Sequence, residues 1–299
     1  MKHAGPLAVA DGIVTNGTGS LRLALPNKGR LATPAVTLLH DAGLDFEVTE
    51  RSLSAQVRNH DLELLFVRTE DICQYVADGV VDLGITGQDL VAERGGGLES
   101  VVPLGFGACA LVLAVPRDGA IRRPEDLVGC RIATGFPRLT SAFLTERAID
   151  ARLVDVHGAV EVTPRLGMAD AIVDLVATGS TLRLNGLRPL ATLLESEAVL
   201  VARAGAPDDR QDPLVTMLSS VLDARGREYM MMNAPASSLD AIRGLIPGLS
   251  GPTVMPLADP TMIAVHSVVE RSHLWRLVPA LKAAGARDIL VVPIEKVIR

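Results

Sequence analysis

The chain has 299 residues, of which 48% are hydrophobic and 21% charged, and its formal net charge is −6. This length exceeds the usual size of one hydrophobic core, so two or three domains are expected. The acidic balance and an aromatic content of only 3% argue against the basic, base-stacking surface of a nucleic-acid binder, so no nucleic-acid partner is expected.

The amino-terminal segment, residues 1–20, is rich in Gly, Ala and Thr without periodicity, and we expect a loose extension there. It lacks the apolar stretch of a signal peptide. No run in the chain approaches the roughly 20 apolar residues of a membrane span, so no membrane partner is expected. The three cysteines are odd in number and lie in apolar stretches, which indicates buried thiols in a reducing compartment. A cytoplasmic location is therefore predicted.

From Leu21 onward, short apolar runs alternate with segments of helical periodicity. Strands are predicted at residues 21–26, 62–67 and 81–86, and helices at residues 31–42 and 72–77. Such alternation is typical of a mainly parallel sheet covered by helices. We place a first lobe at residues 21–109, and an apolar run predicts a strand at about residues 198–210 that returns the chain to this lobe.

A second series of elements indicates a second lobe at residues 110–197. Its strands are predicted at residues 110–116, 131–135 and 159–162, and its helices at residues 124–128 and 141–149. Residues 168–176 are also predicted as a helix, which puts Asp170 and Asp174 together on one face. Two lobes with a crossing strand place a ligand in the cleft between them.

The last segment, residues 213–299, has a different rhythm. Strands are predicted at residues 229–233, 253–257, 262–269 and 289–294, and helices at residues 238–245 and 274–284. This βαββαβ order is the ferredoxin-like arrangement. The polar, turn-rich residues 205–213 are predicted to be a linker. The expected fold class is α/β: a two-lobed part followed by a C-terminal ferredoxin-like domain.

The most informative motif is a turn of small hydroxyl residues around a glycine: Thr178, Gly179, Ser180 and Thr181. A tight turn that leads into a helix offers free N–H groups, hydroxyls and the positive end of a helix dipole, which suit a phosphate dianion. An ordinary helix cap is the competing interpretation, because Ser and Thr are favoured N-caps in general. The acidic pair just before the turn favours the phosphate site.

Predicted strand ends elsewhere carry further candidate ligands. They are Lys28, Gly29 and Arg30 after the first strand, Arg68 after the second, and Thr86 with Gly87 after the third. Basic side chains there are suited to an anionic group at the carboxyl edge of the sheet. Solvated loop residues and a simple turn are the alternatives. The histidines show no ligand spacing, so no protein-bound metal is expected.

Taken together, these segments resemble the ATP phosphoribosyltransferases that open histidine biosynthesis. The resemblance runs from about Leu21 to the carboxyl terminus and is carried by residues 27–31, 78–87, 131–137, 174–182 and 185–187. Residues 174–181 look like that family's phosphoribosyl pyrophosphate signature. The segment after Gln211 resembles the additional domain of the long form, which binds histidine as a feedback inhibitor.

The resemblance implies a fold like that of the two-lobed periplasmic binding proteins. It implies transfer of the 5-phosphoribosyl group of phosphoribosyl pyrophosphate to N1 of ATP, with release of pyrophosphate, and Mg²⁺ as the cofactor that neutralises the leaving charge. The implied partners are ATP, phosphoribosyl pyrophosphate and histidine as an inhibitor. A homo-oligomer, from dimer to hexamer, is also implied.

Residue roles follow from the same resemblance. Catalytic roles are assigned to Asp174 and Asp170. Substrate-binding roles are assigned to Thr178, Gly179, Ser180, Thr181, Lys28, Gly29, Arg30, Arg68, Thr86, Gly87, Glu161 and Arg165. Histidine is expected near Asn233, Leu249 and Thr253, although some relatives carry an acidic residue at the position of Asn233. The chain also departs from the family pattern at Ala110, where relatives often have an arginine, and in the turn at residues 134–137.

Two alternatives remain open at this stage. The architecture alone also fits a solute-binding or effector-sensing module, although neither an export signal nor a DNA-binding helix pair is evident. Prephenate dehydratase likewise couples such a cleft to a small amino-acid-sensing domain, but it has no need of a phosphate turn at residues 178–181. The product formed from ATP, phosphoribosyl pyrophosphate and Mg²⁺ distinguishes the phosphoribosyltransferase from these two alternatives.

Overall fold

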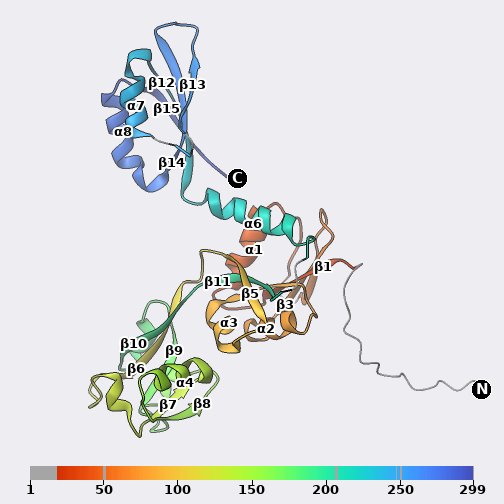
Figure 1. The fold of residues 1–299 in the computed structure, drawn as a ribbon, viewed down its shortest axis with the longest axis vertical. Coiled ribbons are helices and arrows are strands. Elements are labelled where there is room, and N and C mark those ends of the chain that lie inside the picture. The colour runs from red at the N-terminus through yellow and green to blue at the C-terminus, as the bar shows by residue number, and fades with distance from the viewer. Residues whose placement is uncertain (1–18, 50–51, 206–207, 247, 250, 299) are drawn as a thin grey trace, which may run out of the picture. The chain divides into compact units, whose positions relative to one another are not determined.

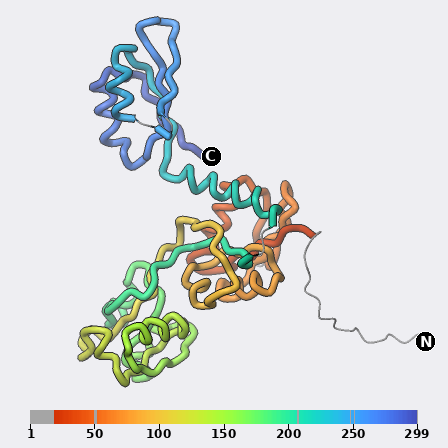
Figure 2. The backbone as a smooth tube through the Cα atoms, viewed as in Figure 1, coloured from red at the N-terminus to blue at the C-terminus, as the bar shows by residue number. Residues whose placement is uncertain are grey.

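The computed structural model describes residues 19–49, 52–205, 208–246, 248–249 and 251–298 (Figures 1 and 2). Most of the expected extension at residues 1–20 lies outside the described residues. The chain forms two units, one with the described residues up to Thr37 together with Leu44–Gln211, the other with Leu38–Gly43 and the residues from Asp212 onward. In the described part, no helix has the length and apolar character needed to cross a membrane.

The first sheet has six strands in the order β2-β3-β1-β4-β11-β5. Its strands are β1 (Leu21–Pro26), β2 (Ser54–Gln56), β3 (Leu62–Val67), β4 (Leu83–Gly87), β5 (Leu98–Pro103) and β11 (Ala198–Arg203). Strand β1 runs parallel to both β3 and β4, so the carboxyl ends of these three strands meet at one edge. Strand β11 enters antiparallel between β4 and β5, after the chain has built the second lobe.

Helices α1 (Ala32–Asp41), α2 (Thr69–Ala77) and α3 (Gln88–Arg94) follow β1, β3 and β4 in turn. Helix α2 buries Ile72 and Val76. A β-carbon on Gly84 would overlap the side chain of Ile72, so the glycine lets α2 approach β4 closely. Helices α2 and α3 begin within two residues of the strands that they follow, whereas residues 27–31 lie between β1 and α1.

The second sheet has five strands in the order β10-β6-β9-β7-β8. Its elements are β6 (Cys109–Pro116), η1 (Pro124–Leu127), β7 (Arg131–Thr134), α4 (Pro137–Glu146), β8 (Arg152–Asp155), η2 (Val160–Val162), β9 (Ala171–Val176), α5 (Ser180–Leu184) and β10 (Leu187–Ser196). Strand β7 is parallel to β8 and β9, so these three strands also end at one edge. Leu111, Ile132 and Val173 are among the buried residues of its core.

Two predictions in this lobe were wrong. Residues 171–176, predicted as helix, form strand β9, paired with β6 on one side and β7 on the other. A short, continuously apolar run fits a buried strand as well as a helix face, and the pairing on both sides decides between them. Asp170 and Asp174 therefore share no helix face. Residues 160–162, predicted as strand, form the 3₁₀ helix η2.

Two connections join the lobes: residues 104–108 between β5 and β6, and Glu197 between β10 and β11. The N–H of Leu104 donates to the carbonyl of Ala198, and the N–H of Ala198 donates to the carbonyl of Phe106, each at 2.9 Å. Figure 2 shows the chain passing twice between the lobes. The first connection is thus hydrogen-bonded to Ala198, the first residue of β11.

The second unit contains a four-stranded antiparallel sheet in the order β13-β14-β12-β15. Its elements are α6 (Asp212–Ala224), β12 (Arg227–Pro235), η3 (Ala236–Ser238), α7 (Leu239–Leu245), β13 (Thr253–Pro256), β14 (Met262–Glu270), η4 (Arg271–His273), α8 (Leu274–Ala283) and β15 (Arg287–Pro293). Met230, Ile242 and Leu281 lie in its core. The expected α/β fold class is confirmed: a two-lobed part with two sheets is followed by a C-terminal domain in the ferredoxin-like βαββαβ arrangement.

Candidate functional site

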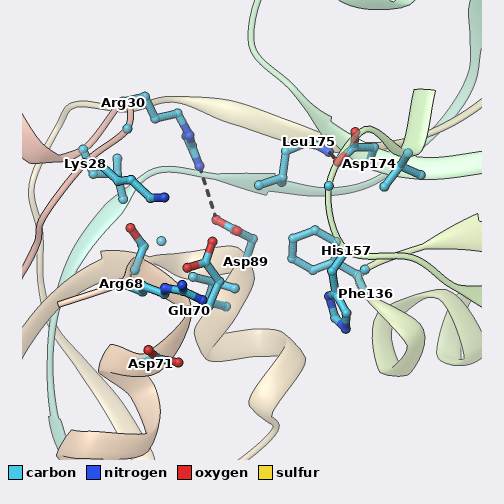
Figure 3. Close-up of a pocket in the computed structure, with 18 of the residues that line it drawn as sticks. Lys28, Arg30, Arg68, Glu70, Asp71, Asp89, Phe136, His157, Asp174 and Leu175 are labelled. Carbon is cyan, nitrogen blue, oxygen red and sulfur yellow. Dashed lines mark hydrogen bonds and ion pairs between the residues drawn. The ribbon is translucent and has the colours of Figure 1, made fainter. Parts of the chain in front are cut away.

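A cavity of about 790 Å³ lies at the carboxyl ends of the parallel strands of both lobes (Figure 3). The first lobe contributes residues that follow β1, β3 and β4, and the second lobe contributes the residues after β7 and β8 together with the end of β9. Ligands of open α/β sheets bind outside the carboxyl ends of the strands. The volume is in the usual range for a small-molecule site.

Three cationic side chains of the first lobe line this cavity: Lys28, Arg30 and Arg68. They come from the ends of β1 and β3, as the sequence predicted, and Gly29 and Gly87 line the cavity with them. Figure 3 shows them on one side of the cavity, with Asp174 and Leu175 of the second lobe on the other. A group of Lys and Arg side chains at a strand edge suits a polyphosphate.

Acidic side chains also line the first-lobe side, and the sequence analysis did not identify them. Glu70 and Asp71 stand in the first turn of α2, where the helix dipole favours negative charge. Asp89 is only 1% exposed. Its Oδ1 accepts a hydrogen bond from the Ser196 hydroxyl at 2.5 Å, and its N–H donates to the same hydroxyl oxygen at 3.0 Å.

The two other residues predicted at the end of β4 support this arrangement. A β-carbon on Gly87 would overlap the carboxylate of Asp89, so only glycine leaves room for that carboxylate. Thr86 is buried and does not line the cavity; its hydroxyl donates to the carbonyl of Thr69 at 3.3 Å. Thr86 therefore holds the start of α2, the helix that follows Arg68.

On the second-lobe side, Asp174 lines the cavity near the end of β9. Its Oδ1 accepts a hydrogen bond from the N–H of Leu175 at 2.8 Å. Burial raises the pKa of Asp174 above its ordinary value, and the negative charge of Glu161 adds to the increase. Phe136 and His157 line the same side and were not predicted. This side offers a carboxylate for hydroxyl groups or for a cationic centre.

The predicted hydroxyl-rich turn follows β9 directly and opens helix α5, although its residues are not among those that line the cavity. Gly179 has φ of +71°, a conformation that favours glycine. The hydroxyls of Thr178 and Ser180 lie 2.9 Å apart, and the Arg183 guanidinium donates to the carbonyl of Thr178 at 3.3 Å. The turn and Asp174 stand at the same carboxyl edge, because Asp174 lies two residues before the end of β9 and the turn follows that end.

Asp170 stands at the other end of β9. Strand geometry separates it from Asp174 by about 13 Å. Its carboxylate accepts hydrogen bonds from the Arg131 N–H at 2.8 Å and from the Arg131 guanidinium at 3.1 and 3.2 Å. Hydrogen bonding to Arg131 lowers the pKa of Asp170. Asp170 does not line the cavity, and neither do Glu161 and Arg165.

We expect Asp170→Asn to lower the free energy of unfolding by about 1 kcal/mol, because the ion pair with Arg131 is partly exposed to solvent. Since the pKa of Asp170 is depressed in the folded protein, this contribution is present at neutral pH and is lost as the pH falls through that value. Urea titrations of both proteins over a series of pH values from 7 down to about 2 measure the difference, which should shrink once the pH falls below the ordinary aspartate pKa.

Glu125→Gln is the matched control, because Glu125 pairs with Arg123 at 3.8 Å in a more exposed position. It should change the unfolding free energy by less than about 0.5 kcal/mol. Turnover of the Asp170 variant should stay within about two-fold of wild type. A large loss of kcat at unchanged stability would instead assign Asp170 to catalysis.

The residues expected near an inhibitor lie in the second unit. Asn233 on β12 donates through Nδ2 to Asp288 Oδ2 at 3.1 Å. Asn233 pairs with Ala264 of β14, whereas Thr253 pairs with His266 from the opposite side of β14. Leu249 is exposed just before β13. The register thus separates Asn233 and Thr253 by strand β14.

These observations define a two-lobed α/β protein whose cavity carries cations on one side and a half-buried carboxylate on the other, beside a turn suited to phosphate. Such a site fits a small phosphorylated compound. It belongs to the class of proteins that bind or convert such compounds at the carboxyl edges of parallel strands.

Comparison with known proteins narrows the class. The chain matches the family model for ATP phosphoribosyltransferase at residues 68–223 and the model for the HisG C-terminal domain at residues 224–296. The ATP phosphoribosyltransferase of Methanocella arvoryzae is 45% identical, covering 93% of this chain and 100% of the relative. The enzyme of Gemmatimonas aurantiaca is also 45% identical, covering 93% and 99%.

A solved structure agrees with these relatives. The ATP phosphoribosyl transferase (HisG:HisZ) complex from Thermotoga maritima matches with a TM-score of 0.58 and 30% identity, covering 67% of this chain and 95% of that chain. The chain belongs to the ATP phosphoribosyltransferase family, in the long form that carries the C-terminal domain. It is a transferase enzyme of the first step of histidine biosynthesis, and both alternatives considered from the sequence are set aside.

Proposed function

We propose that the protein transfers the 5-phosphoribosyl group of phosphoribosyl pyrophosphate to N1 of ATP, giving phosphoribosyl-ATP and pyrophosphate. The observation that carries this proposal is the two-sided cavity. Lys28, Arg30 and Arg68 line one side and Asp174 lines the other. Cations suit the polyphosphate groups of both substrates, and a carboxylate suits ribose hydroxyls or a ribosyl centre that becomes positively charged.

In this reaction N1 of adenine attacks C1 of the ribose while the bond from C1 to the pyrophosphate oxygen breaks, and its electron pair leaves with pyrophosphate. No covalent nucleophile is needed, so positioning and electrostatic stabilisation carry the rate. The turn at residues 178–181 receives the 5-phosphate through its hydroxyls and the N–H groups of α5. Asp174 stabilises the cationic ribosyl centre. Asp170 is not given this role, because its carboxylate is engaged by Arg131.

Thr86 and Gly87 support the site rather than contact the substrate in this proposal. Thr86 holds the start of α2 and Gly87 makes room for Asp89. Glu161 acts on the same side as Asp174, since its charge influences that carboxylate. Arg165 keeps a substrate-binding role on the family resemblance alone.

Mg²⁺ is the proposed cofactor. Among the residues that the structure describes, no group of three or more His, Cys, Asp or Glu side chains is arranged to hold a metal. Mg²⁺ commonly binds through substrate phosphates together with one or two carboxylates, and Glu70 and Asp71 line the cavity beside Arg68. When bound, the ion neutralises charge on the leaving pyrophosphate.

The decisive experiment mixes the protein with ATP, phosphoribosyl pyrophosphate and Mg²⁺ and weighs the nucleotide product by mass spectrometry. We expect a phosphoribosyl-ATP adduct together with an equal amount of released pyrophosphate. Chelation of Mg²⁺ should stop both, and added Mg²⁺ should restore both. Pyrophosphate release without the adduct would reject the proposed acceptor, and the absence of both would reject the reaction.

Feedback inhibition by histidine is a second part of the proposal, and it rests on the ferredoxin-like second unit and the family resemblance. Asn233→Ala should raise the half-inhibitory concentration of histidine by about five-fold, because it removes the proposed polar contact between Asn233 and the bound histidine. Each protein is assayed over a histidine series and compared with its own rate without histidine. Ser237→Ala, on η3 of the same unit, is the control. Equal inhibition of all three proteins would remove Asn233 from the site.

We also propose that the protein acts in the cytoplasm as a homo-oligomer, from dimer to hexamer. Buried free thiols at Cys73 and Cys109 suit a reducing compartment. The assembly rests on the family resemblance, and light scattering of the purified protein tests it.

A further inference from the structure

Arg30 is the cavity cation with the most structured surroundings. Its guanidinium donates to the carbonyl of Gly107, and a second guanidinium nitrogen lies 3.6 Å from Asp89 Oδ1. At 3.6 Å the two groups form an ion pair but are too far apart for a hydrogen bond. Guanidinium has five N–H donors in a fixed plane, so these two contacts orient the group and leave donors for an anion in the cavity.

The carboxylate opposite Arg30 is itself held in place. Asp89 is buried, and the Ser196 hydroxyl contacts it twice, donating to Oδ1 at 2.5 Å and accepting from the Asp89 N–H at 3.0 Å. Ser196 is also buried. The absence of a β-carbon at Gly87 gives the carboxylate its space. Because the Ser196 hydroxyl donates a hydrogen bond to Oδ1, that oxygen has a donor even though Arg30 stays at ion-pair distance.

The groups that hold Arg30 stand beside the two connections between the lobes. Gly107 lies in the connection at residues 104–108, and Ser196 ends β10, directly before Glu197. Glu197 accepts from the Gly105 N–H at 3.0 Å through its side chain. The orientation of one cavity cation therefore depends on side chains and backbone that the two lobes share.

We propose that Asp89 and Ser196 are positioning residues that hold the Arg30 guanidinium ready for the pyrophosphate group of the substrate. This inference rests on the proposed function for the identity of the anion. Without the Ser196 hydroxyl, Oδ1 of the buried Asp89 loses its donor, and a buried carboxylate without a donor is costly. Arg30 is the nearest replacement, so its guanidinium moves onto Asp89 and away from the cavity.

The test is a double-mutant cycle on the full-length protein, with inorganic pyrophosphate as the probe and calorimetry as the measurement. Ser196→Ala should weaken pyrophosphate binding about five-fold, as expected for the loss of an oriented contact to a charged group. In the Arg30→Ala background, the same change at Ser196 should have no further effect. Ser100→Ala is the control, because Ser100 lies in the first lobe with Asp89, makes one side-chain hydrogen bond, to Gln88, and does not line the cavity.

Three results would overturn the proposal: undiminished pyrophosphate binding by Ser196→Ala, the same weakening with and without Arg30, or equal weakening by Ser100→Ala. Ser196→Cys keeps the connectivity of the side chain with a weaker donor. It should fall between wild type and Ser196→Ala, which gives a readout if the alanine variant does not fold. In the full reaction, Ser196→Ala should raise KM for phosphoribosyl pyrophosphate more than it lowers kcat.

The pyrophosphate measurement also separates this inference from the proposed reaction. If wild-type protein forms no phosphoribosyl-ATP but the cycle shows coupling between Ser196 and Arg30, the reaction is wrong and the positioning role stands. If the adduct forms and the cycle shows no coupling, the positioning role is wrong and the reaction stands.

Discussion

Asp174→Asn is expected to lower kcat by about a hundred-fold, which is the usual effect of removing one preorganised electrostatic group from a transition state. Asp174 lines the cavity opposite the cations, and the Leu175 N–H fixes its carboxylate. The substitution keeps the shape of the side chain and removes the negative charge. KM for ATP should change by less than about three-fold, since this charge acts on the ribosyl centre.

The pH dependence gives a second reading of the same group. Burial raises the pKa of Asp174, and only the ionised carboxylate stabilises a cation. Activity of the wild type should therefore fall as the pH drops through a value above the ordinary aspartate pKa. In Asp174→Asn this fall of activity on the acid side of the pH profile, the acid limb, should be missing. Asp150→Asn, at an exposed carboxylate of the same lobe, is the control and should keep both the rate and the limb; a wild-type rate for Asp174→Asn would contradict the assigned role.

Removal of the hydroxyls of the turn at residues 178–181 should change KM for phosphoribosyl pyrophosphate about as much as Asp174→Asn changes kcat. A variant with Thr178→Ala, Ser180→Ala and Thr181→Ala should raise KM for phosphoribosyl pyrophosphate at least about a hundred-fold, because hydrogen bonds to a charged phosphate contribute roughly 1.5–3 kcal/mol each. Gly179 stays in place, so the backbone with φ of +71° is not disturbed. Initial rates over a range of phosphoribosyl pyrophosphate measure the change.

Two companion variants make this result specific. Thr145→Ala, at an exposed hydroxyl on α4, should leave KM unchanged. Gly179→Ala should be impaired for a different reason, because a side chain is strained at this positive φ. Unchanged KM in the triple variant would mean that the turn is an ordinary helix cap, the competing interpretation of the sequence.

The first-lobe side of the cavity was predictable because it depends on local order in the chain. An apolar run that ends in a basic or glycine residue marks a strand end, and parallel strands bring such ends to one edge. Lys28, Arg30, Arg68 and Gly87 were found in this way. Asp89 follows Gly87 by two residues, yet its importance comes from Ser196, more than a hundred positions away. No local pattern reports that contact.

The second lobe shows where periodicity misleads. Residues 171–176 are apolar at nearly every position, so a helical face and a buried strand fit equally well. The helical interpretation pairs Asp170 with Asp174, whereas the structure places Asp170 just before β9 and Asp174 within its second half. Strand β10 (Leu187–Ser196) was not predicted, because it is partly exposed along its length. Tertiary pairing, and not propensity, settles such segments.

The double passage between the lobes also sets an order of events during synthesis. The second lobe is contiguous from Cys109 to Ser196, so all its strands are synthesised in one uninterrupted stretch of the chain. The first lobe lacks β11, which fills the place between β4 and β5, until residues 198–203 have been made. Domains fold largely as units as the chain emerges. The first lobe begins earlier in the sequence but is therefore expected to complete its folding last. The edge of its sheet at β4 stays unpaired while the second lobe is synthesised.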